Sequence, residues 1–109
     1  MGGNLIDIMA DRLKEKFPSL SMDEGCIIAH AYIIKEGKST AMTGNMQTPP
    51  DGCFNSTVGL GFLNSPGSMK AYCMHLVTEK FLCEHESEVG MVRISDPMIP
   101  ICESIINSL

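Results

Sequence analysis

Basic and aromatic residues are scarce in this chain of 109 residues. Trp is absent, only two Tyr and four Phe are present, and eight Lys and Arg stand against 13 Asp and Glu, which gives a formal net charge of -5. Nucleic-acid binding relies on clustered basic side chains that neutralise phosphates and on aromatic rings that stack on bases. The composition therefore argues against a nucleic-acid partner.

Two further absences concern membranes and export. No apolar run approaches the roughly 18 residues that a bilayer-spanning helix needs. The N-terminal segment, MGGNLIDIMADRLKEKF, has neither the basic start nor the uninterrupted apolar stretch of a signal peptide. The five cysteines are odd in number, and no two form a CxxC pair, which is typical of a reduced compartment. We therefore expect a cytoplasmic protein with no membrane association.

Apolar residues, by contrast, are plentiful: 44% of the chain is hydrophobic, and nine residues are Met. A chain of this length buries roughly two-thirds of its unfolded surface, and Met is common on adaptable binding surfaces. We therefore expect part of the apolar surface to lie outside the monomer core, where it would form a homo-oligomer or bind another protein. The alternative is a loosely packed, Met-rich monomer core.

Three segments have helical signals. Residues 4–17 begin at a capping Asn4, end before Pro18 and carry an apolar residue at every fourth position: Leu5, Met9, Leu13 and Phe17. Residues 69–83 follow a capping Ser68, and Lys80 falls within their apolar face, so it must snorkel, pair with an acid or mark the point where the helix leaves the core. The last helix is predicted to open near Pro100 and to bury four side chains: Ile101, Cys102, Ile105 and Leu109.

The apolar run over residues 26–34 has two competing interpretations. Its four Ile favour a strand, with a turn at Lys35–Lys38 and a return strand over Ser39–Asn45. The competitor is a helix over 22–36, because Ser21 and Glu24 form a capping box and Gly37 could end it. We favour the hairpin, since Gly25 and the paired Ile residues suit a helix poorly.

These elements predict one α+β domain over residues 1–109, in which an antiparallel β-hairpin or short sheet is packed by three helices. The expected order is α–β–β–loop–α–(β)–α, where the bracketed strand covers Val89–Ile94. Residues 45–67 have the Pro, Gly and Asn content of a long loop, although alternation at Val58, Leu60 and Phe62 could form a short strand. A turn is expected at Asp96–Pro97.

The loop over residues 52–70 and the helix start after it form the candidate ligand-binding site. Backbone N–H groups at a helix start favour an anion such as a phosphate or carboxylate, although the residues match no established nucleotide-binding motif. The candidate residues are Phe54, Asn64, Ser65, Gly67, Ser68 and Lys70.

Two kinds of reaction centre have weaker support. Cys73 and His75, like Cys83 and His85, are zinc-type ligands, but side chains two residues apart point away from each other on a helix. Cys53 lies in a polar loop where a nucleophilic thiolate could be exposed, yet no signature surrounds it. We therefore expect no metal, no cofactor and no catalytic residue, with a small metal- or cysteine-dependent enzyme as the remote alternative.

The sequence as a whole is typical of a small, non-catalytic regulatory protein of the inhibitor or accessory type. We expect it to act through protein–protein contacts, as a homodimer or another homo-oligomer. The alternative is a protein that binds a small molecule, nucleotide or other anion through the loop at 52–70.

Overall fold

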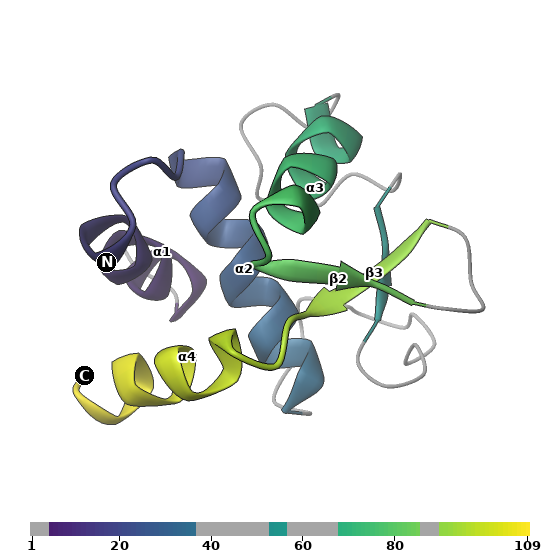
Figure 1. Cartoon of the computed structure of the whole chain (residues 1–109). Coiled ribbons are helices and arrows are strands. Elements are labelled where there is room, and N and C mark those ends of the chain that lie inside the picture. Colours follow the sequence, from purple (N-terminus) through teal and green to yellow (C-terminus); the bar gives the residue numbers. More distant parts are fainter. Residues whose placement is uncertain (1–4, 37–52, 57–67, 86–89) are drawn as a thin grey trace.

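The computed structural model describes residues 5–36, 53–56, 68–85 and 90–109. Within these ranges the chain forms four helices and one three-stranded antiparallel sheet (Figure 1). The elements are α1 (Leu5–Lys16), α2 (Met22–Lys35), β1 (Phe54–Asn55), α3 (Met69–Thr78), β2 (Leu82–Glu84), β3 (Met91–Ile94) and α4 (Met98–Asn107). The prediction of a small α+β domain is confirmed.

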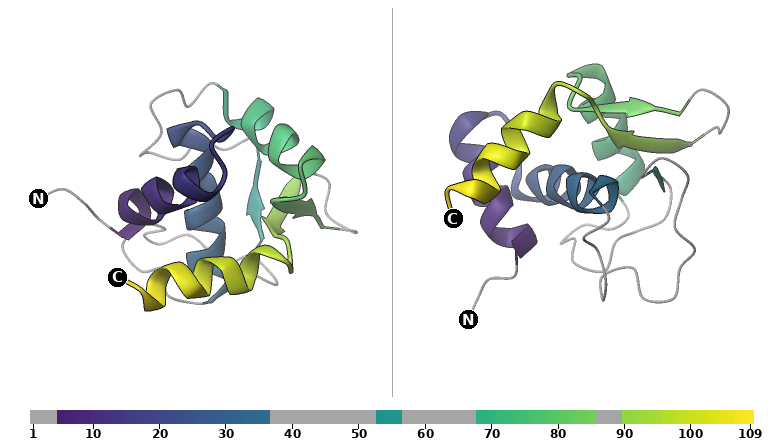
Figure 2. Two further views of the ribbon diagram at one scale, coloured as in Figure 1. Left: turned by 60° about the vertical axis from the view of Figure 1, so that its left-hand side comes forward. Right: turned by 90° about the horizontal axis from the view of Figure 1, so that it is seen from below.

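Helix α2 is the centre of the molecule, with α1, α3, α4 and the sheet arranged around it (Figure 2). Every residue from Asp23 to Ile34 is buried. A helix that is apolar on all sides is stable only when other elements cover it completely. The apolar run of α2 therefore supplies the core of the monomer.

The strand predicted over residues 26–34, as the first arm of a hairpin, is wrong, because these residues belong to α2. The helical competitor is correct, including its capping box, in which the Ser21 side chain accepts from the Glu24 N–H at 3.1 Å and the Glu24 carboxylate accepts from the Ser21 N–H at 3.0 Å. The return strand predicted over 39–45 lies outside the described residues.

Gly25, which argued against a helix, has a packing role inside it. A Cβ at this position would lie 3.2 Å from both the Cβ and the carbonyl oxygen of Ala10 on α1. Glycine lowers helix propensity by about 1 kcal/mol, but here its missing side chain lets the backbones of α1 and α2 approach closely. Intrinsic propensity was therefore outweighed by a tertiary contact.

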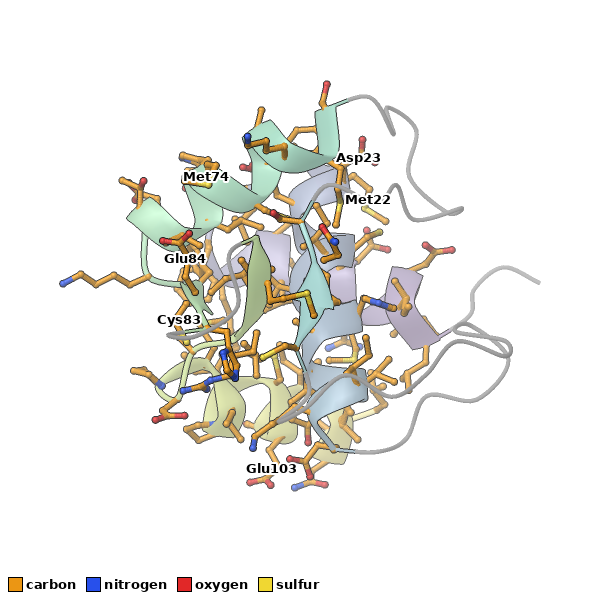
Figure 3. The ribbon with its side chains drawn as sticks, turned by 90° about the vertical axis from the view of Figure 1, so that its right-hand side faces the viewer. Met22, Asp23, Met74, Cys83, Glu84 and Glu103 are labelled. Carbon is orange, nitrogen blue, oxygen red and sulfur yellow. The ribbon has the colours of Figure 1, made fainter. Side chains whose placement is uncertain are left out.

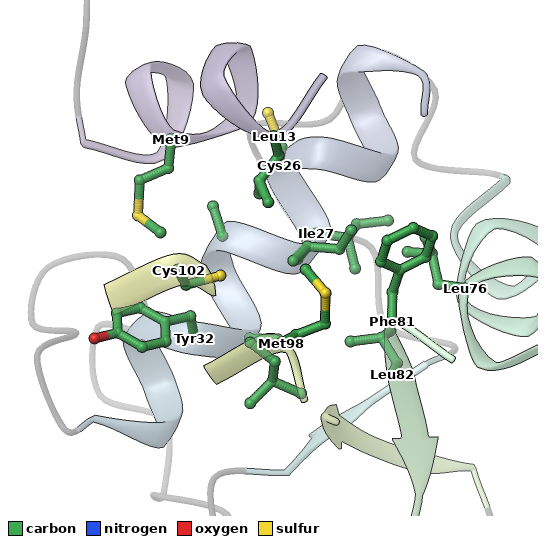
Figure 4. Packing of buried hydrophobic residues seen from close by; sticks show 14 of the residues in the cluster. Met9, Leu13, Cys26, Ile27, Tyr32, Leu76, Phe81, Leu82, Met98 and Cys102 are labelled. Carbon is green, nitrogen blue, oxygen red and sulfur yellow. The ribbon is translucent and has the colours of Figure 1, made fainter. Parts of the chain in front are cut away.

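Helix α1 follows its predicted apolar pattern except at Leu5, and the predicted cap Asn4 lies outside the described residues. Met9 and Leu13 are fully buried and pack in the cluster shown in Figure 4. Ile6 is also buried, whereas Leu5 and Ile8 are 39% and 38% exposed. The helix ends before Pro18, as expected from a proline ring that blocks continuation.

Helix α3 is shorter than predicted, because it ends at Thr78 and not at residue 83. Lys80 takes a left-handed backbone conformation with φ of 69°. Its N–H donates to the carbonyl of Val77 at 3.1 Å, and the Phe81 N–H donates to the carbonyl of Leu76 at 2.9 Å. This pair of bonds is a Schellman motif, which ends a helix and redirects the chain. Lys80 thus marks the point where the helix leaves the core.

The sheet has the order β1–β3–β2. Leu82 pairs with Ile94, and Val92 pairs with both Glu84 and Phe54. The apolar members of these pairs are buried, so one face of the sheet lies against the helices. The predicted short strand before Ile94 is confirmed as β3, and the alternation at Val58, Leu60 and Phe62 lies outside the described residues.

Helix α4 follows the predicted turn at Asp96–Pro97 and begins at Met98, two residues before Pro100. Pro100 is tolerated in the first turn because N–H groups there have no partner within the helix. Cys102 and Ile105 are buried as predicted, whereas Ile101 is half-buried and Leu109 is 52% exposed. The predicted burial of Leu109 is therefore wrong, since the helix ends at Asn107.

Candidate functional site

The predicted ligand site is only partly within the described ranges, which exclude Asn64, Ser65 and Gly67. Phe54 is 6% exposed in the core, where its ring meets that of His30 edge to face at 5.4 Å. Ser68 precedes α3 but makes no side-chain cap hydrogen bond, and Lys70 is exposed. Ligand binding by the loop and Lys70 stays a prediction.

The cysteines are mostly core residues. Cys53 is fully buried, so the exposed position considered for it is wrong. Burial raises the pKa of the thiols of Cys26 and Cys73 to about 11 and that of Cys102 to about 12. These three thiols are therefore protonated at neutral pH and are poor nucleophiles. Cys83 differs, because its side chain is half-buried at the sheet surface.

The paired Cys and His residues do not come together. Cys73 is buried, whereas His75, two residues later, is exposed and contacts Glu24 on α2. In the described part of the chain, no three His, Cys, Asp or Glu side chains are grouped as a metal site requires. None of the helices described there is long and apolar enough to cross a membrane.

A polar cluster joins the start of α2 to α3. His75 Nδ1 lies 2.5 Å from Glu24 Oε2, and the Tyr72 hydroxyl donates to Asp23 Oδ2 at 3.2 Å. The hydrogen bond from Glu24 and its negative charge raise the pKa of His75. The capping box already uses the other oxygen of Glu24, so both carboxylate oxygens are engaged. This cluster fixes α3 against α2.

The sequence alone does not indicate this cluster. The capping box of Ser21 and Glu24 is a local signal, and it explains the presence of the Glu24 carboxylate without any second partner. The partner, His75, is 51 residues away in the chain, and no local pattern specifies such a contact.

Strand β2 has hydrogen-bond partners on one side only within the described sheet. The Ser95 N–H donates to the carbonyl of Phe81 at 3.1 Å, and the His85 N–H donates to the carbonyl of Met91 at 2.9 Å. Hydrogen bonding alternates along an antiparallel strand, so Phe81, Cys83 and His85 face β3. The backbone N–H and C=O groups of Leu82 and Glu84 therefore point away from the sheet.

A groove of about 390 Å³ lies between the end of α3 and the start of α4, and residues of β2 and β3 also line it. Val77 and Pro97 supply apolar surface to the groove, and Lys80 and Glu84 supply opposite charges. Figure 3 shows Cys83 and Glu84 of β2 on the same side of the molecule as Met74 of α3, which is 42% exposed.

The groove also contains a fixed cation. Arg93 lies directly across from Cys83 on β3 and donates to the carbonyl of Ile94 at 2.9 Å and to Asp96 Oδ1 at 3.2 Å. These two bonds hold the guanidinium at the sheet surface, so the groove combines apolar contacts with opposite charges and an open strand edge.

A smaller cavity of about 220 Å³ lies between α1 and α4, with Arg12, Lys16, Ser104 and Ser108 in its lining. Both helices end there, and helix C-termini are partly negative. Lys16, in the last turn of α1, is therefore favourably placed at this helix end, and the acidic Glu15 also lines the cavity.

Comparisons of the chain with protein-family models, with curated proteins and with solved structures found no match.

Proposed function

We propose that this protein is a non-catalytic regulatory protein that binds an extended segment of a partner protein along the edge of β2. The observation that carries the proposal is the outward direction of the Leu82 and Glu84 backbone groups at an edge strand. An added strand would satisfy these groups with main-chain hydrogen bonds, while the neighbouring groove would select its side chains.

The apolar groove and its charges support this proposal. A strand added at this edge would lie next to the groove, because Leu82 and Glu84 are among the residues that line it. Apolar surface at Val77 and Pro97 would contribute to affinity, and the charges of Lys80 and Glu84 would contribute to specificity.

The cysteines support a reducing, cytoplasmic location for this function. All five lie in the described ranges, and none of them forms a disulfide. Proteins with several unbridged cysteines are typical of compartments in which glutathione and thioredoxin keep thiols reduced.

The decisive experiment replaces Glu84 with a photo-crosslinking residue, p-benzoylphenylalanine, in the full chain within the cells that naturally produce it. A matched control carries the same residue at Glu103, which is exposed on α4 (Figure 3). We expect illumination to give an adduct of discrete mass from position 84 and none from position 103. The absence of an adduct from position 84, or equal adducts from both positions, would contradict the proposal.

A further inference from the structure

The β2 edge has the properties of a surface that binds itself. We propose that its occupant is β2 of a second copy of this chain, paired antiparallel about a two-fold axis that passes beside Cys83. This inference rests on the proposed function, because it uses the same edge and names the partner.

The first argument is the register of the backbone. Leu82 and Glu84 carry the outward-pointing groups, so an antiparallel pair centred on Cys83 places Leu82 opposite Glu84 of the second copy, and the reverse. Two residues that face each other at such positions exchange both hydrogen bonds. The two-fold arrangement would therefore satisfy all four outward groups of each copy within the three residues of β2.

The second argument is charge. Lys80 precedes β2 and Glu84 ends it, and both line the groove. Antiparallel pairing brings the basic end of one strand beside the acidic end of the other, which is favourable on a sheet surface. A parallel pair, or an antiparallel pair centred on Glu84, would instead bring like charges together. Charge complementarity thus favours the antiparallel direction, while the outward backbone groups of Leu82 and Glu84 select the register centred on Cys83.

Cys83 is a native reporter of this register. At the axis it would face Cys83 of the second copy at a position without hydrogen bonds, where Cα atoms are about 4.5 Å apart. That distance is within the range of a disulfide. Diamide, a diazene oxidant, should therefore join the two copies: two S–H bonds are lost, one S–S bond forms, and two protons and two electrons reduce the diazene to a hydrazine.

The test uses the purified full chain in analytical ultracentrifugation under reducing conditions. We expect a dimer whose dissociation constant is raised about 30-fold by Glu84→Pro. In the proposed pair the Glu84 N–H of each copy donates one intermolecular hydrogen bond, and proline has no N–H, so two bonds are lost. Glu84→Ala is the matched control, since it keeps that N–H and should retain most of the dimer. A wild-type chain that stays monomeric, or a dimer equally stable with Glu84→Pro, would overturn the inference.

Charge reversal tests the antiparallel direction of the pair without proline, in case Glu84→Pro fails to fold. Glu84→Lys should weaken the dimer about 3- to 10-fold, because two ion pairs become repulsive. Adding Lys80→Glu in the same chain should restore it. A double variant as weak as Glu84→Lys would contradict the antiparallel pairing.

Diamide treatment should give a covalent species of twice the chain mass, and Cys83→Ser should abolish it while the reduced dimer remains. A covalent dimer that persists with Cys83→Ser would contradict the placement of the axis. The photo-crosslinking experiment separates the two proposals. An adduct of some other mass, together with a monomeric purified chain, would overturn the second copy as partner and leave strand addition standing.

Discussion

Helix α2 is buried along almost its whole length, whereas strand β2 is only partly buried. From Asp23 to Ile34, α2 is covered on every side, whereas β2 is hydrogen-bonded along one edge and its residues range from buried Leu82 to exposed Glu84. Many of the apolar residues in the described ranges are therefore buried inside the monomer. In β2, by contrast, outward backbone groups lie at an edge of the described sheet, and the opposite charges of Lys80 and Glu84 lie beside it.

The strongest test of this contrast compares Ile27→Ala in α2 with Cys83→Ala in β2. Ile27 is fully buried within the cluster (Figure 4), so the cavity should lower the free energy of unfolding by about 3 kcal/mol. The half-buried Cys83 should lose less than about 1 kcal/mol. Urea denaturation measures both, and equal losses would contradict the contrast.

Acidification should also act through α2. Burial of the ring lowers the pKa of His30 from 6.5 to about 4, so between these values the unfolded chain binds a proton that the folded chain does not. The contribution of the neutral His30 ring to stability is thus complete above pH 6.5. The free energy of unfolding should fall by about 2–3 kcal/mol as the pH is lowered towards 4.5. Denaturation at several pH values measures this. His30→Leu should flatten the slope, and an unchanged slope would exclude His30 as its source.

The contact between α1 and α2 predicts a smaller loss. Gly25→Leu would force side-chain atoms against the backbone of Ala10, which already lies 3.2 Å from the position of a Cβ. We expect a loss of about 2 kcal/mol in thermal or urea unfolding. In the control Gly25→Ala, the gain in helix propensity of about 1 kcal/mol should offset much of the tighter contact. A Leu variant as stable as the wild type would contradict the close packing.

At the junction of α3 and β2 we expect a substitution that raises the free energy of unfolding and does not lower it. Lys80 adopts a φ of 69°, a conformation that costs a residue with a side chain about 1 kcal/mol and costs glycine little. Lys80→Gly should therefore stabilise the protein by up to about 1 kcal/mol, measured by thermal unfolding. Lys80→Ala is the control, since it removes the charge and keeps the strain. A destabilised glycine variant would show that the Lys side chain matters more than the backbone.

The weakest effect is expected at the contact between Glu24 of α2 and His75 of α3. Because the hydrogen bond and charge of Glu24 raise the pKa of His75, its contribution is complete below pH 6.5 and is lost as pH rises through the higher pKa of the folded state. The exposed fraction of its side chain, 48%, keeps the effect small. The advantage of the wild type over His75→Gln should therefore shrink from about pH 6 to about pH 9. A stability difference that stays constant with pH would contradict a stabilising contact between Glu24 and His75.

Several elements could be predicted because their signals are local. The stripe of α1 and its end at Pro18 follow from spacing and from one proline ring. The N-terminus of α2 follows from Ser21 and Glu24, although the Ile residues and Gly25 suggested a strand. The end of α3 could not be predicted, because it uses a Schellman motif with Lys80 in place of glycine.

The candidate interface was visible in the sequence only as surplus apolar residues. Its position depends on which side of β2 receives hydrogen bonds from β3, and no local pattern specifies these bonds, which include one between Phe81 and Ser95. Leu82 and Cys83 of this edge are instead predicted as part of the helix over residues 69–83.

By itself the sequence determined the α+β class, the first helix and the turn at Asp96–Pro97, because caps, prolines and apolar spacing act within a few residues. Tertiary structure alone decided that residues 26–34 are helical, that Gly25 packs on Ala10 and that Glu24 meets His75. The physical reason is burial: a helix covered on all sides gains more from excluding water than its Ile and Gly residues lose in helix propensity.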